Sequence, residues 1–320
     1  MSITVVGSIA YDTVKTPFGE RERMLGGAAV HFALAASFFD TVHVVGPVGE
    51  DFGEEQLEVL RARGVNTSDI EHVAGGKTFF WHGEYGWDLN TRETLDTQLG
   101  VFEGFEPKLS DASRASDVLF LANIQPDLQR QVRVQMPDAR FVALDSMNLW
   151  IEIARDSLVA AISGVDCVIL NDAELRQLTG KPNLVAAARD VLAWGAEQSG
   201  DGRGPSVIVA KQGEYGAALV TQESFFALPA YPLETVVDPT GAGDTFAGGL
   251  VGYIAAHPSE TIDDDLLRRA MAHAAVLASF NVEEFGTERV SRLTGREIVA
   301  RISELHAMTQ FSGAPLALRG

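Results

Sequence analysis

The chain has 320 residues, 46% of them hydrophobic, and its 44 acidic and 25 basic residues give a net charge of −19. This charge opposes binding to nucleic acid and to anionic membranes, so we expect neither as a partner. The single cysteine, Cys167, excludes an intramolecular disulfide and a thiolate metal cluster. Because the N-terminus lacks the basic region of a secretory signal and no apolar run reaches about 20 residues, we expect a cytoplasmic protein.

Short apolar runs rich in β-branched residues alternate along the chain with helix-periodic segments. The runs are apolar at successive positions, as in strands buried on both faces of a parallel sheet. The alternation predicts an α/β fold with a doubly wound, mainly parallel sheet flanked by helices, built as a single domain over residues 1–320. The predicted strands are residues 3–6, 42–45, 118–121, 141–144, 167–170 and 207–210, and the predicted helices are residues 28–39, 54–63, 127–135, 149–162 and 184–198.

Two segments interrupt this alternation. Residues 13–23 follow the first predicted strand without a helical pattern, and residues 77–102 combine aromatic side chains with a polar tract. They could pair as a small sheet outside the main one, or they could be two surface loops. Exposed aromatic side chains in such a sheet would favour burial against a second subunit, so we expect a homodimer that forms through it.

The run from Asp238 to Gly249 is the segment most suggestive of chemistry. It joins a β-rich segment, residues 234–237, to a helix-periodic segment, residues 245–256, and so places backbone N–H groups at a helix N-terminus that favours anions. Asp244 in this run would repel a phosphate, but it is suited to take the proton of a hydroxyl that attacks one. The alternative is an ordinary strand–turn–helix connection with a capping Asp. The run matches neither a Walker A loop nor the Rossmann fingerprint.

The sequence Asp-Pro-Thr-Gly-Ala-Gly-Asp-Thr-Phe at residues 238–246 resembles the C-terminal signature of the ribokinase-like (PfkB) carbohydrate kinase family. Five further stretches resemble motifs of this family and follow in its order, at residues 5–12, 26–35, 48–53, 171–174 and 211–216, although Gly53 comes one residue early. The resemblance implies a ribokinase-like fold in which the small sheet is a lid over the substrate and often a dimer interface. It also implies ATP and Mg²⁺ as cofactors.

The catalytic residues that this resemblance implies all lie in one turn. Asp244 would be the base, and the backbone N–H groups of Gly241, Ala242, Gly243 and Asp244 would hold the charge of the transferred group. Phosphoryl transfer needs positioning and charge neutralisation more than covalent chemistry, which such a turn supplies.

The substrate-binding residues that the resemblance implies are Asp12, Gly26, Gly27 and His31. A carboxylate such as Asp12 can accept two hydroxyl hydrogen bonds, which suits a polyol, although a turn-capping role is the alternative. The glycines let the backbone come close to a sugar. His31 stands where the family usually has Asn, so ribose, adenosine and fructose 6-phosphate are unsafe assumptions; a core histidine is the alternative.

The nucleotide side is expected to include Asn171, Lys211, Gly213 and His273, with Glu174 organising Mg²⁺, either directly or through a water molecule. Asn171 and Glu174 also fit an N-cap and its capping box, and Lys211 fits a solvated strand end. Gly213 suits the geometry of a turn. His273 lies among alanines and resembles the residue that lies against adenine in the family, with a partnered core histidine as the alternative.

Further polar residues have open roles. Asp238 and Thr240 match positions that bind a monovalent cation in some relatives, which leaves potassium as an additional cofactor to test. Asp145 follows a predicted strand and could line the site or form a turn. Arg92, in the expected lid, could contact a phosphate already on the substrate.

Taken together, these features predict an ATP-dependent kinase that phosphorylates a hydroxyl of a small sugar or polyol. A nucleoside kinase of the same fold is one alternative, because the aromatic residues of the expected lid could accommodate a base. A non-catalytic sensor of sugars or nucleotides is another, which the presence of Asp244 argues against.

Overall fold

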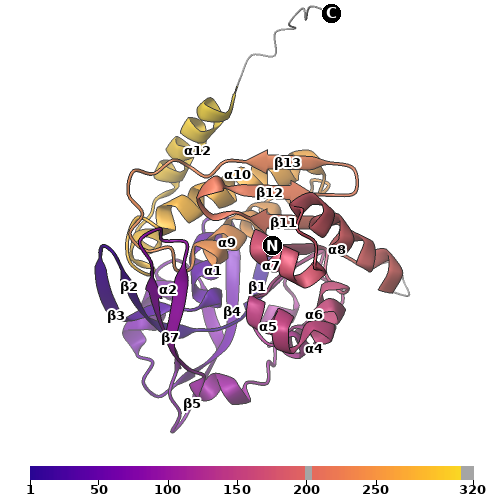
Figure 1. Ribbon diagram of the computed structural model, residues 1–320. Helices are drawn as coiled ribbons and strands as arrows, with labels where there is room; N and C mark the ends of the chain where they lie inside the picture. The colour runs from indigo at the N-terminus through magenta and orange to yellow at the C-terminus, as the bar shows by residue number, and fades with distance from the viewer. Residues whose placement is uncertain (199–203, 311–320) are drawn as a thin grey trace, which may run out of the picture.

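The computed structural model describes residues 1–198 and 204–310, and its centre is a nine-stranded sheet with the order β13-β12-β11-β10-β9-β8-β1-β4-β5 (Figure 1). All pairs from β11 to β5 are parallel, and β12 and β13 add two antiparallel strands at one edge. Every strand predicted from the sequence is present. The strands are β1 (Ser2–Val6), β4 (Thr41–Gly49), β5 (Asn66–Val73), β8 (Val118–Leu121), β9 (Phe141–Asp145), β10 (Cys167–Asn171), β11 (Val207–Lys211), β12 (Ala217–Val220) and β13 (Phe225–Leu228).

Helices cover both faces of this sheet. Successive strand residues point to opposite sides, so a strand that is apolar throughout needs apolar partners on both faces. Val5 belongs to an apolar cluster that includes α1, α9 and α10, and Val6 belongs to a second cluster that includes α4, α6, α7 and α8. The prediction of a doubly wound α/β sheet is therefore confirmed. The helices are α1 (Ala28–Ala36), α2 (Glu54–Arg61), α3 (Asp111–Arg114), α4 (Pro126–Gln135), α5 (Asn148–Ile153), α6 (Arg155–Ile162), α7 (Asp172–Thr179), α8 (Leu184–Gln198), α9 (Ala242–Ala255), α10 (Asp264–Asn281), α11 (Glu288–Ser291) and α12 (Gly295–Thr309), with 3-10 turns η1 (Gly100–Gly104) and η2 (Gly213–Tyr215).

The two interrupting segments form a separate four-stranded sheet, called the lid below. It has the order β3-β2-β6-β7 and consists of β2 (Ala10–Thr16), β3 (Gly19–Gly26), β6 (Phe79–Tyr85) and β7 (Arg92–Gln98). Asp51, beyond the end of β4, holds the start of β6, because its carboxylate accepts bonds from the backbone N–H and the hydroxyl of Thr78. The expectation of a small sheet is confirmed, and the surface-loop alternative is wrong.

Two local expectations are wrong. The β-rich residues 234–237 form no strand, because the N–H groups of Val237 and Asp238 donate to the carbonyl of Val282, after α10, rather than to a neighbouring strand. The helix expected over residues 149–162 is broken at Ala154, whose φ of −141° and ψ of 34° separate α5 from α6.

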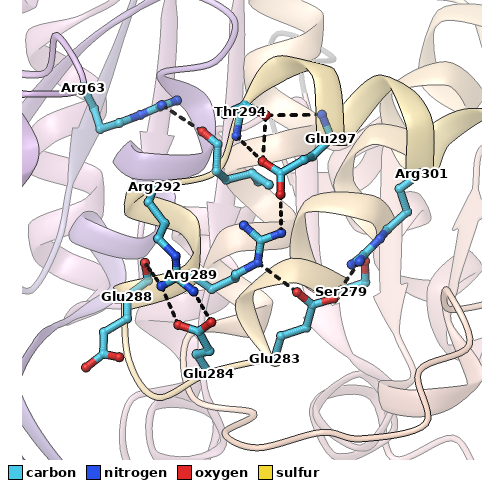
Figure 2. A network of polar contacts seen from close by, with 11 residues as sticks. Arg63, Ser279, Glu283, Glu284, Glu288, Arg289, Arg292, Thr294, Glu297 and Arg301 are labelled. Atoms are coloured by element: carbon cyan, nitrogen blue, oxygen red, sulfur yellow. Dashed lines mark hydrogen bonds and ion pairs between the residues drawn. The ribbon is translucent and has the colours of Figure 1, made fainter.

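A network of ion pairs ties the segment after α10 to α11 and α12 (Figure 2). Glu283 accepts from Arg289 at 2.9 Å and from Arg301 at 2.6 Å, and Arg289 also donates to Glu297 at 2.7 Å. The guanidinium of Arg301 lies 3.5 Å from the centre of the Phe280 ring. Because these arginines are mostly shielded from water, the network fixes residues 282–287 more firmly than exposed pairs would.

None of the helices in the described ranges combines the length and hydropathy that a membrane-spanning helix requires.

Candidate active site

The turn at residues 238–244 leads directly into α9. Gly241 is the N-cap of this helix and has a φ of 74°, which favours glycine, and a Cβ at this position would overlap the imidazole of His31. The N–H of Ala242 donates to the carbonyl of Pro239 at 3.2 Å. One of the four donors expected for the anion hole is therefore already engaged, and Gly241, Gly243 and Asp244 remain as the donors of this helix N-terminus.

Asp244 is half-buried in the first turn of α9. Burial and, after it, the charge of Asp145 raise the pKa of its carboxyl to about 7, against the opposing charges of Lys211 and Arg92. A carboxyl with a pKa near neutrality can both take and return a proton, which is the property that a general base requires.

Lys211 and Asp145 form a shielded ion pair beside this turn. The ammonium of Lys211 lies 2.8 Å from Oδ2 of Asp145, and a Cβ on Gly243 would lie 3.0 Å from the same ammonium. Burial would lower the pKa of Lys211, but Asp145 and Glu174 outweigh it and raise that pKa. The lysine is therefore charged and lies at the edge of the turn at residues 238–244.

Asn171 and Glu174 form the capping box of α7. The amide oxygen of Asn171 accepts from the backbone N–H of Glu174, and the carboxylate of Glu174 accepts from the backbone N–H of Asn171, each at 2.8 Å. Asn171 lies opposite Lys211 in the β10–β11 register, which brings α7 to the ion pair. Burial raises the pKa of Glu174 to about 7, with Lys211 opposing and Asp145 adding to the shift. The pair thus caps a helix and also borders the site.

Asp12 lies in β2 of the lid sheet and is buried. Burial raises the pKa of its carboxyl to about 7, and the backbone N–H of Gly27 partly opposes the shift. A Cβ on Gly26 would overlap this carboxylate, and Gly27 has a φ of 94° at the start of α1. Both glycines are therefore required where the lid meets the main sheet.

His31 is only 2% exposed and is packed beneath Gly241. Its Nδ1 lies 3.1 Å from Oδ1 of Asn281, and its buried Nε2 has no partner in the described part of the chain. Burial lowers the pKa of His31 to about 4, so the ring is neutral. The bond of Nδ1 fits the alternative of a partnered core histidine, whereas Nε2 lacks such a partner among the described residues, and the substrate contact of His31 stays a prediction.

Asp238 and Thr240 lie next to the turn and are held by the protein itself. The carboxylate of Asp238 accepts from the backbone N–H groups of Thr240 and Gly286, each at 2.9 Å, and the hydroxyl of Thr240 lies 3.3 Å from that of Tyr85 in the lid. Burial raises the pKa of Asp238. The contact to Tyr85 brings the lid to the turn at residues 238–244.

The lid also reaches the nucleotide side. Gly213 has a φ of 56° in the turn after β11, and a Cβ there would lie 3.1 Å from Oδ1 of Asn90 at the tip of the lid. Asn90 also lies 3.4 Å from Glu214. Arg92, at the start of β7, lowers the pKa values of Asp12, Glu174 and Asp244, so its charge is near all three.

His273 lies elsewhere. Its ring stacks on Tyr253 with a centroid distance of 4.2 Å and meets Phe39 edge-on at 5.9 Å. Tyr253 is nine residues beyond Asp244 on α9, which corresponds to about 13 Å along the helix axis. On the same helix as His273, Arg268 lies over Phe226 in β13. His273 therefore faces Phe39, which lies beyond the end of α1, and Tyr253 of α9. This position gives no geometric support for an adenine contact.

Two residues of this region have roles that sequence reasoning did not assign. The pairing of Asp145 with Lys211 joins strands 66 positions apart. Asn281, the last residue of α10, donates to the carbonyl of Thr240 in the turn at residues 238–244. The only sequence signal for this role of Asn281 is its place as a polar residue at the end of an apolar helix.

A family model described as pfkB family carbohydrate kinase matches residues 2–292. The chain belongs to this family. It is 31% identical over 267 residues to a cytidine kinase of Thermococcus kodakarensis, which covers 81% of this chain and 91% of the relative, and 35% identical over 277 residues to a fructokinase of Klebsiella pneumoniae, which covers 80% and 85%. The crystal structure of adenosine kinase from Sinorhizobium meliloti has the same fold, with a TM-score of 0.78 at 18% identity and coverage of 95% and 99%.

The family resemblance seen in the sequence is thus confirmed, together with the ribokinase-like fold and its lid. The chain is an ATP-dependent phosphotransferase that acts on a hydroxyl of a sugar or a nucleoside. The sensor alternative is therefore set aside.

Proposed function

We propose that Asp244 is the catalytic base and that the N–H groups of Gly241, Gly243 and Asp244 stabilise the transferred phosphoryl group. The observation that carries this assignment is the half-buried Asp244 carboxyl, with a pKa of about 7, at the N-terminus of α9. The helix terminus supplies donors for negative charge, and the carboxylate supplies a proton acceptor for the attacking hydroxyl. Lys211 would hold the nucleotide phosphates in place beside the turn.

The carboxylates Asp145 and Glu174 fit a magnesium ion that is bound mainly through nucleotide phosphates. No group of three or more His, Cys, Asp or Glu side chains among the described residues is arranged to hold a metal alone. Mg²⁺ keeps several waters and usually takes one or two carboxylates plus phosphate oxygens, so a dedicated cage is not required. The ion would neutralise charge on the phosphates. Asp238 and Thr240 keep their proposed role at a monovalent cation, and Asn171 and Gly213 shape the nucleotide side.

We further propose that the acceptor is a nucleoside, phosphorylated on a hydroxyl of its ribose. Asp12 would accept hydrogen bonds from ribose hydroxyls next to the backbone of Gly26 and Gly27. The neighbours of Asp12 across the lid strands are Met24 and Trp81, and both pack against an apolar cluster with Val14 and Tyr85. A base offers this cluster a flat, weakly polar face, whereas a small sugar carries hydroxyls on every side. The 31% identity to a cytidine kinase agrees with this choice.

A ketose sugar is the second candidate. The 35% identity to a fructokinase favours it, and the same carboxylates would serve either acceptor. Under either acceptor, Tyr85, which already contacts Thr240 of the turn, and Arg92 would lie over the substrate.

The test is a set of ATP-consumption assays with cytidine, adenosine, ribose and fructose as acceptors, with phosphorus NMR to locate the new ester. Turnover of nucleosides only would support the proposal, and turnover of sugars only would replace it with the second candidate. Asp244→Asn should lose turnover by about 1,000-fold or more while ADP binding is retained. Asp172→Asn, at a partly exposed carboxylate of α7 that pairs with Arg176, is the control and should keep its activity.

A homodimer that forms through the lid and a cytoplasmic location remain predictions. All seven residues of β7 are exposed, as are Phe18 and Trp87 at the lid tips, which would suit a subunit contact. Sedimentation equilibrium of the wild type and of Trp87→Ser would test the dimer.

A further inference from the structure

The catalytic turn has no strand to hold it. Residues 231–240 contain no helix or strand, so the turn that precedes α9 lacks the ladder of hydrogen bonds expected from the sequence. A turn whose N–H groups must point at a phosphate needs other fixed partners, because a misplacement of about 1 Å is enough to slow an enzyme considerably.

The end of α10 supplies these partners. The side-chain N–H of Asn281 donates to the carbonyl of Thr240 at 2.7 Å, and the N–H of Val237 donates to the carbonyl of Val282 at 2.8 Å. The N–H of Gly286 donates to the carboxylate of Asp238 at 2.9 Å. Residues 281–286 therefore bond to the turn at three successive places.

Asn281 is the centre of this arrangement. It is fully buried, and besides Thr240 its amide contacts His31 on α1 and Thr245 on α9. The carbonyl of Thr240 can only accept a hydrogen bond, so the NH₂ group of Asn281 must face it. The Oδ1 atom of Asn281 must then face His31 and Thr245. The hydroxyl of Thr245 donates to Oδ1, and the neutral imidazole must carry its proton on Nδ1 to do the same.

His31 completes the support from below. Its ring fills the space under Gly241 that a Cβ would occupy, so the ring and the glycine fit one another. The partner that orients this ring is Asn281. The side-chain amide of Asn281 thus fixes the carbonyl of Thr240, the hydroxyl of Thr245 and the ring of His31, on which Gly241 lies.

We propose that Asn281 is a positioning residue for phosphoryl transfer, which acts by holding the Gly241–Asp244 turn in its anion-binding conformation through Thr240, Thr245 and His31. The proposal rests on the proposed role of that turn. It assigns the unusual His31 a supporting role in place of a substrate contact. The ion pairs of Glu283 with Arg289 and Arg301 brace the segment that follows Asn281 (Figure 2).

The test compares Asn281→Ala, Thr245→Val and Ser279→Ala with the wild type. Ser279 is the matched control, because it is a buried polar residue of the same helix. Its hydroxyl bonds to Val276 and Arg301, and within the described part of the chain it makes no hydrogen bond to the turn. Asn281→Ala should lower kcat roughly 10- to 100-fold with either cytidine or fructose, with KM for ATP changed by less than about threefold. Thr245→Val removes one bond and should show a smaller loss in the same parameter.

Amide hydrogen exchange provides a measure that needs no substrate. In Asn281→Ala, exchange should accelerate in residues 237–245 and stay unchanged in β11 and β12, whereas Ser279→Ala should leave residues 237–245 protected. If Asn281→Ala fails to fold, Thr245→Val carries the test alone. Wild-type kcat together with wild-type exchange in these variants would overturn the proposal.

Asp244→Asn, assayed in the same series, separates this inference from the proposed function. An active Asp244→Asn enzyme would show that the role of the turn is wrong. An inactive Asp244→Asn enzyme beside a fully active Asn281→Ala enzyme would show that the positioning role of Asn281 is wrong.

Discussion

The pH dependence of turnover offers the sharpest test of the proposed base. Asp244 must be ionised to accept a proton, and its pKa of about 7 lies well above the ordinary 3.8. The ionised fraction in the free enzyme is then about a tenth at pH 6 and about nine tenths at pH 8, so kcat/KM should rise roughly tenfold between these values. An unperturbed aspartate would give a flat profile over this range.

Asp145→Asn should move this profile in a defined direction. The substitution removes a negative charge that raises the pKa of Asp244, and it leaves the ammonium of Lys211, which lowers that pKa, without its partner at 2.8 Å. Both changes favour the ionised base. The acid limb should therefore shift to lower pH.

The assay is kcat/KM, measured from pH 5.5 to 9 with both substrates well below saturation so that it reports the pKa values of the free enzyme, with each variant normalised to its own plateau and its folding checked by circular dichroism. Asp172→Asn should leave the limb unchanged. Glu174→Gln is a second control, because Glu174 also has a pKa of about 7, and removing it should not abolish the limb. A limb that vanishes with Glu174→Gln, or that moves up with Asp145→Asn, would refute the assignment of the base to Asp244.

Three further predictions concern stability and geometry. The folded-state pKa of Asp12 is raised to about 7, so its contribution to stability is present below about pH 3.8 and is lost as pH rises through 7. The melting temperature of Asp12→Asn, measured by calorimetry, should therefore increase relative to that of the wild type between pH 5 and pH 8. A difference in melting temperature that stays constant over this range would contradict the prediction. Gly241→Ala should lower kcat at least about 100-fold, because the new Cβ meets His31 and the φ of 74° is strained; unchanged kinetics would show that the turn adapts. Glu283→Gln should lower the free energy of unfolding by about 2 kcal/mol and the melting temperature by roughly 2–6 °C. Glu288→Gln, at an exposed position, should change neither. Equal effects of the two substitutions would contradict a stabilising role for the network of Figure 2.

The main sheet and the turn at Gly241 could be predicted from the sequence because both leave local patterns. Buried parallel strands such as β1 and β10 are continuous apolar runs, and the turn at Gly241 needs small residues at fixed spacing. The capping box of Asn171 and Glu174 is likewise a pattern of three residues, and the structure contains it. The lid was recognisable as an interruption, but its β2–β6 pairing joins segments about 70 residues apart and had no local signal.

Long-range partnerships account for most of what was missed. The role of His31 depends on its fit against Gly241, 210 positions away, and on the amide of Asn281, 250 positions away. The β-rich composition of residues 234–237 was misleading because an extended segment can satisfy its N–H groups with a helix terminus as well as with a strand. The adenine contact expected for His273 stays a prediction, because the sequence does not reveal the orientation of its helix about its own axis.

The distribution of charge within the site explains why an acidic protein can bind an anionic nucleotide. Asp12, Glu174 and Asp244 each have a pKa near 7 because they are buried, so part of their negative charge is neutralised by protons at neutral pH. Lys211 keeps its charge because Asp145 and Glu174 raise its pKa. The local field at the turn is therefore far less negative than the net charge of −19 suggests. Binding of a cation at these carboxylates would lower their pKa values and release protons, which links nucleotide binding to the ionisation of the base.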